Sequence, residues 1–122
     1  MNRLGNMTKV QTDLYVLRYN ARNQDFNVLS LSEESIIIPA CILDEKKSIK
    51  DQLDSLLATH IDNKPSINYR LFNNIIIDDT FHCIYFTTIS ENIKLNKQTF
   101  LLSVKKYGIY SPNIQKIMQL IC

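Results

Sequence analysis

The apolar residues of this 122-residue chain twice switch from the alternation typical of strands to the spacing typical of helices, and this pattern limits the fold most. Large apolar side chains alternate with other residues over 13–19 and over 26–31, with a polar turn between them. Alternation of this kind predicts a β-hairpin with a buried face. A third short strand is predicted at 36–38, because Pro39 lacks the backbone donor needed to continue it.

The spacing becomes helical between Ser48 and His60. Ser48 is a favourable N-cap residue, and Asp51 lies in the first turn, which is close to a capping box. One side of the helix is apolar, and the other carries charged and polar residues. The apolar stripe consists of Ile49, Leu53, Leu56, Leu57 and His60. We therefore expect an amphipathic helix that packs on the strands.

The second half of the chain repeats this change of spacing. Strands are expected at 75–77, 81–89 and 100–105, and 67–72 is a further extended segment. Ser111 and Pro112 then provide an N-cap and a first-turn proline for a final helix. The predicted order is β-β-β-α-β-β-β-α. We expect a single α/β (α+β) domain over 12–122, preceded by a flexible tail over 1–11.

Glycine is scarce, because the chain contains only Gly5 and Gly108. P-loops, dinucleotide-binding loops and the GxSxG turn of serine hydrolases need glycines at spacings that this chain lacks, so these classes are excluded. Residues with AT-rich codons (Phe, Tyr, Met, Ile, Asn and Lys) number 53, whereas Gly, Ala, Arg and Pro together number 12. We expect an AT-rich genome, such as that of a phage or another virus.

The three cysteines are odd in number and form no CxxC pair, so a reducing cytoplasm is expected. No apolar run approaches the roughly 18 residues of a membrane span, and the first twelve residues lack the apolar core of a signal peptide. We expect a cytoplasmic protein, in the host cytoplasm or the virion if the gene is viral, with no membrane partner.

A zinc site built from Cys41, His60, His82 and Cys83 is conceivable from the residue types alone. However, His82 and Cys83 are neighbours on a predicted strand, so their side chains point to opposite faces and do not readily share an ion. We expect no metal site and no cofactor.

The order of elements resembles that of the Nudix hydrolase family over nearly the whole chain. The likeness rests on that order and on two local segments, Tyr15-Val-Leu-Arg-Tyr-Asn20 entering the sheet and Ile37-Ile-Pro39 leading toward the helix. The resemblance implies an α/β/α sandwich with a mixed sheet. In the family, a glycine-containing loop leads into a helix whose glutamates hold the divalent metals that polarise a diphosphate and activate water.

Aligning this motif with the chain recovers few of its acids. If Cys41 takes the place of the first glycine, the motif's key positions hold Lys47, Ser55, Leu56, Thr59 and His60. A shift by one residue gives Lys46, Asp54, Ser55, Ala58 and Thr59, and a shift by two recovers Glu45 and Asp54 but leaves Leu57 and Ala58 at the metal pair. Hard divalent cations need several oxygen ligands. The sequence therefore predicts a degenerate Nudix motif and a protein that is not an enzyme.

Our leading hypothesis is a protein-binding or structural subunit of a larger phage or viral assembly. The apolar strands also offer an edge for strand addition. One alternative is a residual metal-dependent hydrolase of nucleoside diphosphate derivatives, with Glu45, Asp51 and Asp54 as ligands.

The last third of the chain is basic, which adds a second alternative, a nucleic-acid-binding accessory protein. Lysines with nearby tyrosines could contact phosphates or an acidic protein. The candidate partner-binding residues are Lys94, Lys97, Lys105, Lys106, Tyr107 and Tyr110.

Overall fold

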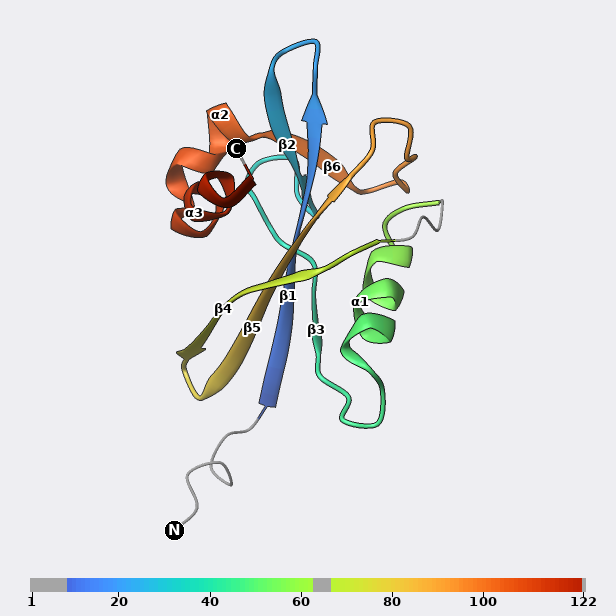
Figure 1. Ribbon diagram of the computed structural model, residues 1–122, viewed down its shortest axis with the longest axis vertical. Helices are drawn as coiled ribbons and strands as arrows, with labels where there is room; N and C mark the ends of the chain where they lie inside the picture. Colours follow the sequence, from blue (N-terminus) through green and yellow to red (C-terminus); the bar gives the residue numbers. More distant parts are fainter. Residues whose placement is uncertain (1–8, 63–66, 122) are drawn as a thin grey trace.

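The structure, a computed structural model, describes residues 9–62 and 67–121. These residues form one mixed sheet with helices on both sides (Figure 1). The strands are β1 (Lys9–Asn20), β2 (Asp25–Ser30), β3 (Ala40–Ile42), β4 (Arg70–Ile77), β5 (Thr80–Ile89) and β6 (Phe100–Ser103). The helices are α1 (Ile49–Ala58), α2 (Val104–Tyr107), the 3-10 turn η2 (Gly108–Tyr110) and α3 (Pro112–Ile121).

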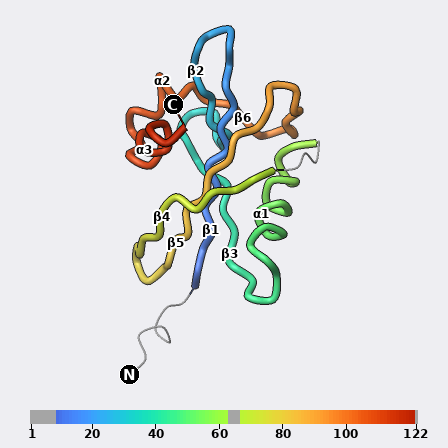
Figure 2. The backbone as a smooth tube through the Cα atoms, in the orientation of Figure 1, coloured from blue at the N-terminus to red at the C-terminus, as the bar shows by residue number. Residues whose placement is uncertain are grey.

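Strand β1 organises the sheet, which runs in the order β4-β5-β1-β2-β6. It pairs in parallel with β5 along 9–18 and, on its other edge, antiparallel with β3 at 11–13 and with β2 at 17–20. The backbone trace in Figure 2 shows β1 running through the middle of the molecule between these neighbours. The expected mixed sheet is therefore confirmed.

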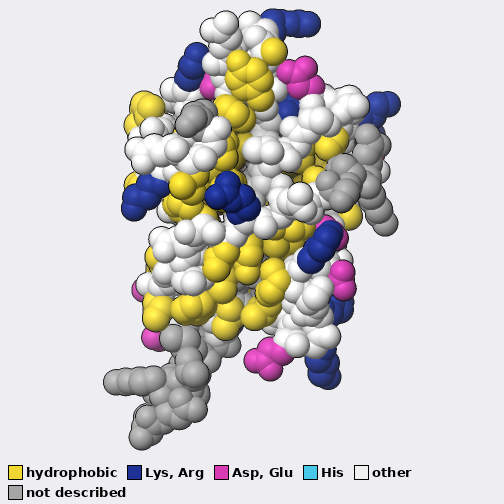
Figure 3. Space-filling model, in the orientation of Figure 1, with side chains coloured by type: hydrophobic (Ala, Val, Ile, Leu, Met, Phe, Trp, Pro, Cys, Tyr) yellow, Lys and Arg dark blue, Asp and Glu magenta, His cyan; other side chains and the backbone are white. Residues whose placement is uncertain are grey.

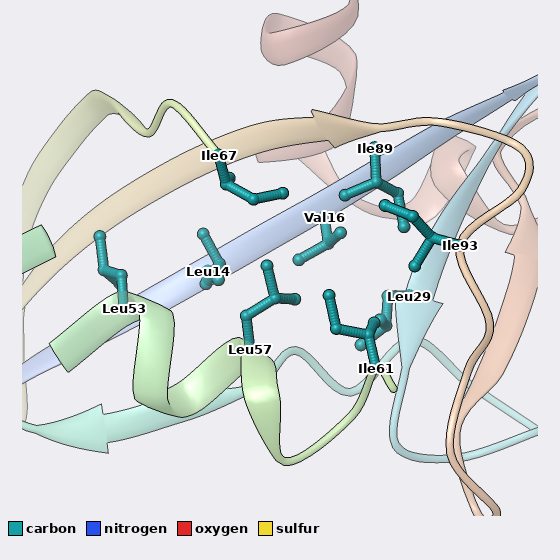
Figure 4. Close-up of a cluster of buried hydrophobic side chains, with 9 residues drawn as sticks. All are labelled: Leu14, Val16, Leu29, Leu53, Leu57, Ile61, Ile67, Ile89 and Ile93. Carbon is teal, nitrogen blue, oxygen red and sulfur yellow. The ribbon is translucent and has the colours of Figure 1, made fainter. Parts of the chain in front are cut away.

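The side chains of β1 alternate between two apolar layers, so the strand forms part of two cores. Leu14 and Val16 pack with Leu53 and Leu57 of α1, which point toward them in Figure 4. Tyr15 and Leu17 face the other way. There they pack with Ile84, Phe86, Ile114 and Ile117 of β5 and α3. The predicted α/β/α sandwich is confirmed.

The amphipathic helix forms where the sequence predicts it. Ser48 is the N-cap residue, and its side chain accepts a hydrogen bond from the backbone N–H of Asp51. The stripe is buried at Leu53 and Leu57. Gln52 is also buried, which the apolar stripe does not predict, because its side chain bonds the loop before the helix.

The strand predicted at 36–38 is wrong, and β3 instead follows Pro39. The reason lies in Ser30, whose hydroxyl accepts from the Ile37 N–H and donates to the carbonyl oxygens of Ser32 and Ser35. These bonds fold the segment into a loop. The carbonyl oxygen of Pro39 accepts from the Leu14 N–H at 3.0 Å, which aligns the chain with β1 only at this point.

Other boundaries also move. The second half of the segment predicted at 67–72 and the strand predicted at 75–77 merge in the single strand β4, whereas 67–69 lie outside it. This strand has a register shift between Leu71 and Asn73. The last strand ends at Ser103, before the predicted end at residue 105, because the Ser103 side chain caps α2. Strand β1 begins at Lys9, inside the predicted tail, whose first eight residues lie outside the described part of the chain.

The final helix starts at Pro112 as predicted, and the Ser111 hydroxyl accepts from the Ile114 N–H. Among the described residues, no helix has the length and apolar character needed to cross a membrane.

Candidate functional site

The three acids proposed as metal ligands lie in α1 and in the loop before it, but Asp54 differs from the other two in its surroundings. Glu45 and Asp51 are exposed, and the backbone N–H of Asp51 bonds the Ser48 cap. Asp54 is half-buried and is held by two neighbours. It accepts from the Lys50 ammonium at 2.8 Å and from the Tyr69 hydroxyl at 2.5 Å.

The contacts of Asp54 set the charges on this side of α1. Burial acts to raise the pKa of Asp54, but the hydrogen bonds from Lys50 and Tyr69 and the Lys50 charge outweigh it, so the pKa lies below its ordinary value. Burial and the neighbouring carboxylate raise the pKa of Tyr69. Asp54 is therefore an anion and Tyr69 a neutral donor at neutral pH.

Lys50 and Tyr69 also border a small depression between α1 and the start of β4. It has a volume of about 220 Å³ and is lined by Ile49, Lys50, Leu53, Ile67, Asn68 and Tyr69. Three or more His, Cys, Asp or Glu side chains placed to hold one metal ion do not occur among residues 9–62 and 67–121. The described residues therefore do not fit the metal centre that the Nudix resemblance implies.

The histidine and cysteine side chains are dispersed over the sheet. Thr12 of β1 pairs with Cys41 on one side and with Cys83 on the other, so a strand separates the two thiols. His82 bonds Asp13 at 2.8 Å through its Nδ1 atom. Burial lowers the pKa of His60 at the end of α1. The structure does not bring the four zinc candidates together.

A larger groove of about 610 Å³ lies on the opposite side of the sheet, beside α3. Its lining includes the predicted Tyr107 and Tyr110. Sequence reasoning missed Ile36 and Ile38 because the loop that carries them was predicted as a strand, and it missed Tyr15 because a strand pattern does not show what its side chain lines. The Asn113 side chain donates to the Tyr15 hydroxyl at 3.2 Å and fixes that ring at the groove wall.

The candidate lysines do not form one surface. Lys94 and Lys97 lie in the loop whose Ile93 and Leu95 pack on the α1 side of the sheet. Lys105 and Lys106 belong to α2, which packs on the α3 side through Val104. The sequence places these lysines close together along the chain, but the sheet separates them.

Strand β4 forms an exposed edge of the sheet. Within the described residues it pairs only with β5. Leu71, Ile76 and Ile77 are 54%, 59% and 49% exposed, and Figure 3 shows hydrophobic side chains gathered over β4 and β5. Large apolar side chains gathered on one exposed strand are typical of a surface that binds another molecule.

No protein-family model matches the sequence, and no curated protein is significantly similar to it. Solved structures share the fold. A mutT/nudix family protein from Listeria innocua has a TM-score of 0.71 at 11% identity, over 93% of this chain and 94% of that one. A MutT/nudix family protein from Enterococcus faecalis has a TM-score of 0.63 at 16% identity, over 78% of this chain. The match covers only 43% of the Enterococcus chain. The chain therefore has a Nudix-like fold.

Two further structures carry functional descriptions. An Ap4A hydrolase from C. elegans has a TM-score of 0.65 at 8% identity, over 95% of this chain and 100% of that one. The C-terminal domain of mouse MUTYH, solved in complex with human PCNA, has a TM-score of 0.67 at 13% identity, over 93% of this chain and 86% of that one.

These comparisons contradict the prediction that the chain is not an enzyme, because the proteins with this fold are Nudix family members that include a hydrolase. That prediction rested on one sequence motif and is withdrawn. The comparisons do not bear on the expected phage or viral origin.

Proposed function

We propose that the chain is a protein-binding module that accepts a strand from a partner at the free edge of β4. The observation that carries this proposal is the exposure of Leu71, Ile76 and Ile77 on a strand that, among residues 9–62 and 67–121, pairs on one side only. An unpaired edge presents backbone donors and acceptors that an added strand can satisfy. The MUTYH domain, which shares the fold, was solved with a protein partner.

The hairpin that contains β4 is already shaped for this role. Asp78 and Asp79 connect β4 to β5 with positive φ angles of 49° and 64°, as in the two-residue turns that match the twist of paired strands. In such a hairpin Ile77 and Thr80 exchange hydrogen bonds. The Asn74 N–H donates to the Asn73 side-chain oxygen at 2.9 Å, whereas the Asn74 carbonyl and the backbone groups of Ile76 point outward. A partner strand would bond these groups and cover the neighbouring apolar side chains.

A displayed library of short linear peptides, selected on the purified chain, tests this function. We expect peptides with alternating apolar residues that bind the wild-type chain and lose binding to Ile76→Lys. Ile109→Lys is the matched control, because Ile109 is also exposed, at 62%, but lies in η2. Peptides that bind the Ile76→Lys chain as well as the wild type would refute β4 as the docking edge.

A second function, hydrolysis of a nucleoside diphosphate derivative, is favoured by the fold, which an Ap4A hydrolase shares. Glu45, Asp51 and Asp54 remain the acids proposed for this activity. Since they do not group around one ion, no metal-dependent step is derived for them.

Incubation with Ap4A and with ADP-ribose in millimolar Mg²⁺ or Mn²⁺, followed by chromatography of the nucleotides, tests this second function. Product that forms with the wild type and with Asp79→Asn, in the hairpin turn, but not with Asp54→Asn would assign the activity to the α1 side. No product from the wild type with either substrate would reject hydrolysis of these two compounds and leave the strand-addition proposal intact.

A further inference from the structure

The charges at the two ends of β4 suggest which strand adds to it. Arg70 is the first residue of β4, and Asp78 and Asp79 follow its last residue. The strand between them, from Leu71 to Ile77, contains no charged residue. Its two ends therefore have opposite charge, and the stretch between them is apolar apart from Asn73 and Asn74.

We propose that the added strand is β4 of a second copy, which pairs antiparallel to form a two-fold dimer with one continuous sheet. This inference rests on the proposed strand addition at β4. A two-fold axis near Asn73 and Asn74 brings Arg70 of each copy beside Asp78 of the other. Parallel pairing would instead place the two Arg70 side chains together, so the charges favour the antiparallel arrangement.

In this arrangement, the apolar side chains of β4 in one copy also meet those of β4 in the other. Leu71 pairs with Tyr85 and Ile76 with Phe81, so both project from the same face of the sheet. In the antiparallel pair, Leu71 of one copy lies near Ile76 of the other, and this contact occurs twice. Each copy then covers apolar surface that is more than half exposed in the single chain.

Strand β4 lacks most features that keep sheet edges apart. It contains no proline and no lysine, which commonly protect such edges. Its one irregularity is the register shift between Leu71 and Asn73. The Arg70 guanidinium lies 5.1 Å from the centre of the Phe86 ring of β5. The edge therefore has few features that would prevent it from pairing with a second copy.

Sedimentation equilibrium of the full chain over a range of concentrations tests the proposal. We expect the mass to double reversibly as concentration rises. Arg70→Glu should weaken dimerisation by about tenfold or more, because two attractive ion pairs become repulsive. Asp78→Asn combined with Asp79→Gly keeps residues that suit the turn and removes the acids, so it should restore dimerisation to the Arg70→Glu chain.

Ile76→Lys should remove the dimer altogether, whereas Ile109→Lys should leave it unchanged. Circular dichroism shows whether each variant is folded. A wild-type chain that stays monomeric at every concentration overturns the second copy as partner, as does a dimer that persists in folded Ile76→Lys. If the monomeric wild type still binds library peptides at β4, only this inference fails. If neither peptides nor a second copy bind there, the proposed function fails with it.

Discussion

The region around α1 and the edge at β4 differ in the surroundings of their polar and apolar groups. In the first region, Gln52 is buried and bonds the backbone of Asp44 and Lys47, and Asp54 is held by two side chains. At β4, apolar side chains and outward backbone groups have solvent on one side. The buried and hydrogen-bonded side chains near α1 thus stabilise the domain, whereas the apolar side chains and outward backbone groups of β4 are exposed.

The largest difference between the two regions should appear in core packing. Leu53→Ala removes a fully buried side chain between α1 and β1, and should lower the free energy of unfolding by about 3 kcal/mol. Leu71→Ala in β4 should change it by less than about 0.5 kcal/mol, because Leu71 is exposed. Urea unfolding at low protein concentration measures both. Equal losses would mean that β4 is as tightly packed as α1.

The next difference concerns polar groups. Gln52→Ala leaves the Asp44 N–H and the carbonyl oxygens of Asp44 and Lys47 without their side-chain partner, so it should cost about 2 kcal/mol. Asn74→Ala, on the exposed edge, should cost less than about 0.5 kcal/mol. Hydrogen exchange should also show faster exchange at Asp44 in the Gln52 variant. An unchanged Asp44 rate would show that the side chain does not hold the loop.

A smaller, pH-dependent effect is expected from His60. Burial lowers the pKa of His60 in the folded chain, so the unfolded chain binds its proton first as pH falls. The stability that comes from keeping His60 neutral is therefore complete above the unfolded pKa of about 6.5 and is lost as pH falls through the folded pKa. Unfolding midpoints between pH 8 and 5 should fall less for His60→Gln than for the wild type. Parallel curves would remove His60 as the cause.

The smallest effect concerns Asp54, whose pKa is lowered in the folded chain. Its stabilising contribution is present above the unfolded pKa of about 3.9 and is lost as pH falls through the lower folded pKa. Asp54→Asn should therefore be less stable than the wild type at pH 7, and the gap should close toward pH 3. A gap that is constant with pH would show that the Lys50 and Tyr69 contacts do not depend on the carboxylate charge.

The periodicity of the sequence predicted the α1 core, the hairpin and the final helix, because each depends on residues close together in the chain. It did not predict contacts set by the path of a loop. The Ser30 hydroxyl turns 36–38 away from a strand, and Tyr69 reaches Asp54 across 15 residues. The predicted basic patch combined lysines that are close only along the chain. The loop that carries Lys97 packs on the α1 side through Leu95, whereas the helix that carries Lys105 packs on the α3 side through Val104.

The edge itself could be anticipated only in general terms. Apolar alternation identifies a strand, but it does not reveal which strand lies last in the sheet, because that depends on pairing between distant segments. Strand β5 pairs with β1 across about seventy residues, and this parallel pairing is what leaves β4 at the edge. A pairing of Arg70 with Asp78 of a second copy can be inferred only once β4 is known to lie at the edge of the sheet.

Hydrogen exchange followed residue by residue, at low and at high protein concentration, shows whether β4 is the docking edge. We expect the amide of Ile76 to exchange quickly in dilute solution and to become protected as concentration rises, while amides in α1 keep their rates. Protection that rises in α1 and not at Ile76 would refute a β4 interface, because the partner would then occupy the helix side of the sheet.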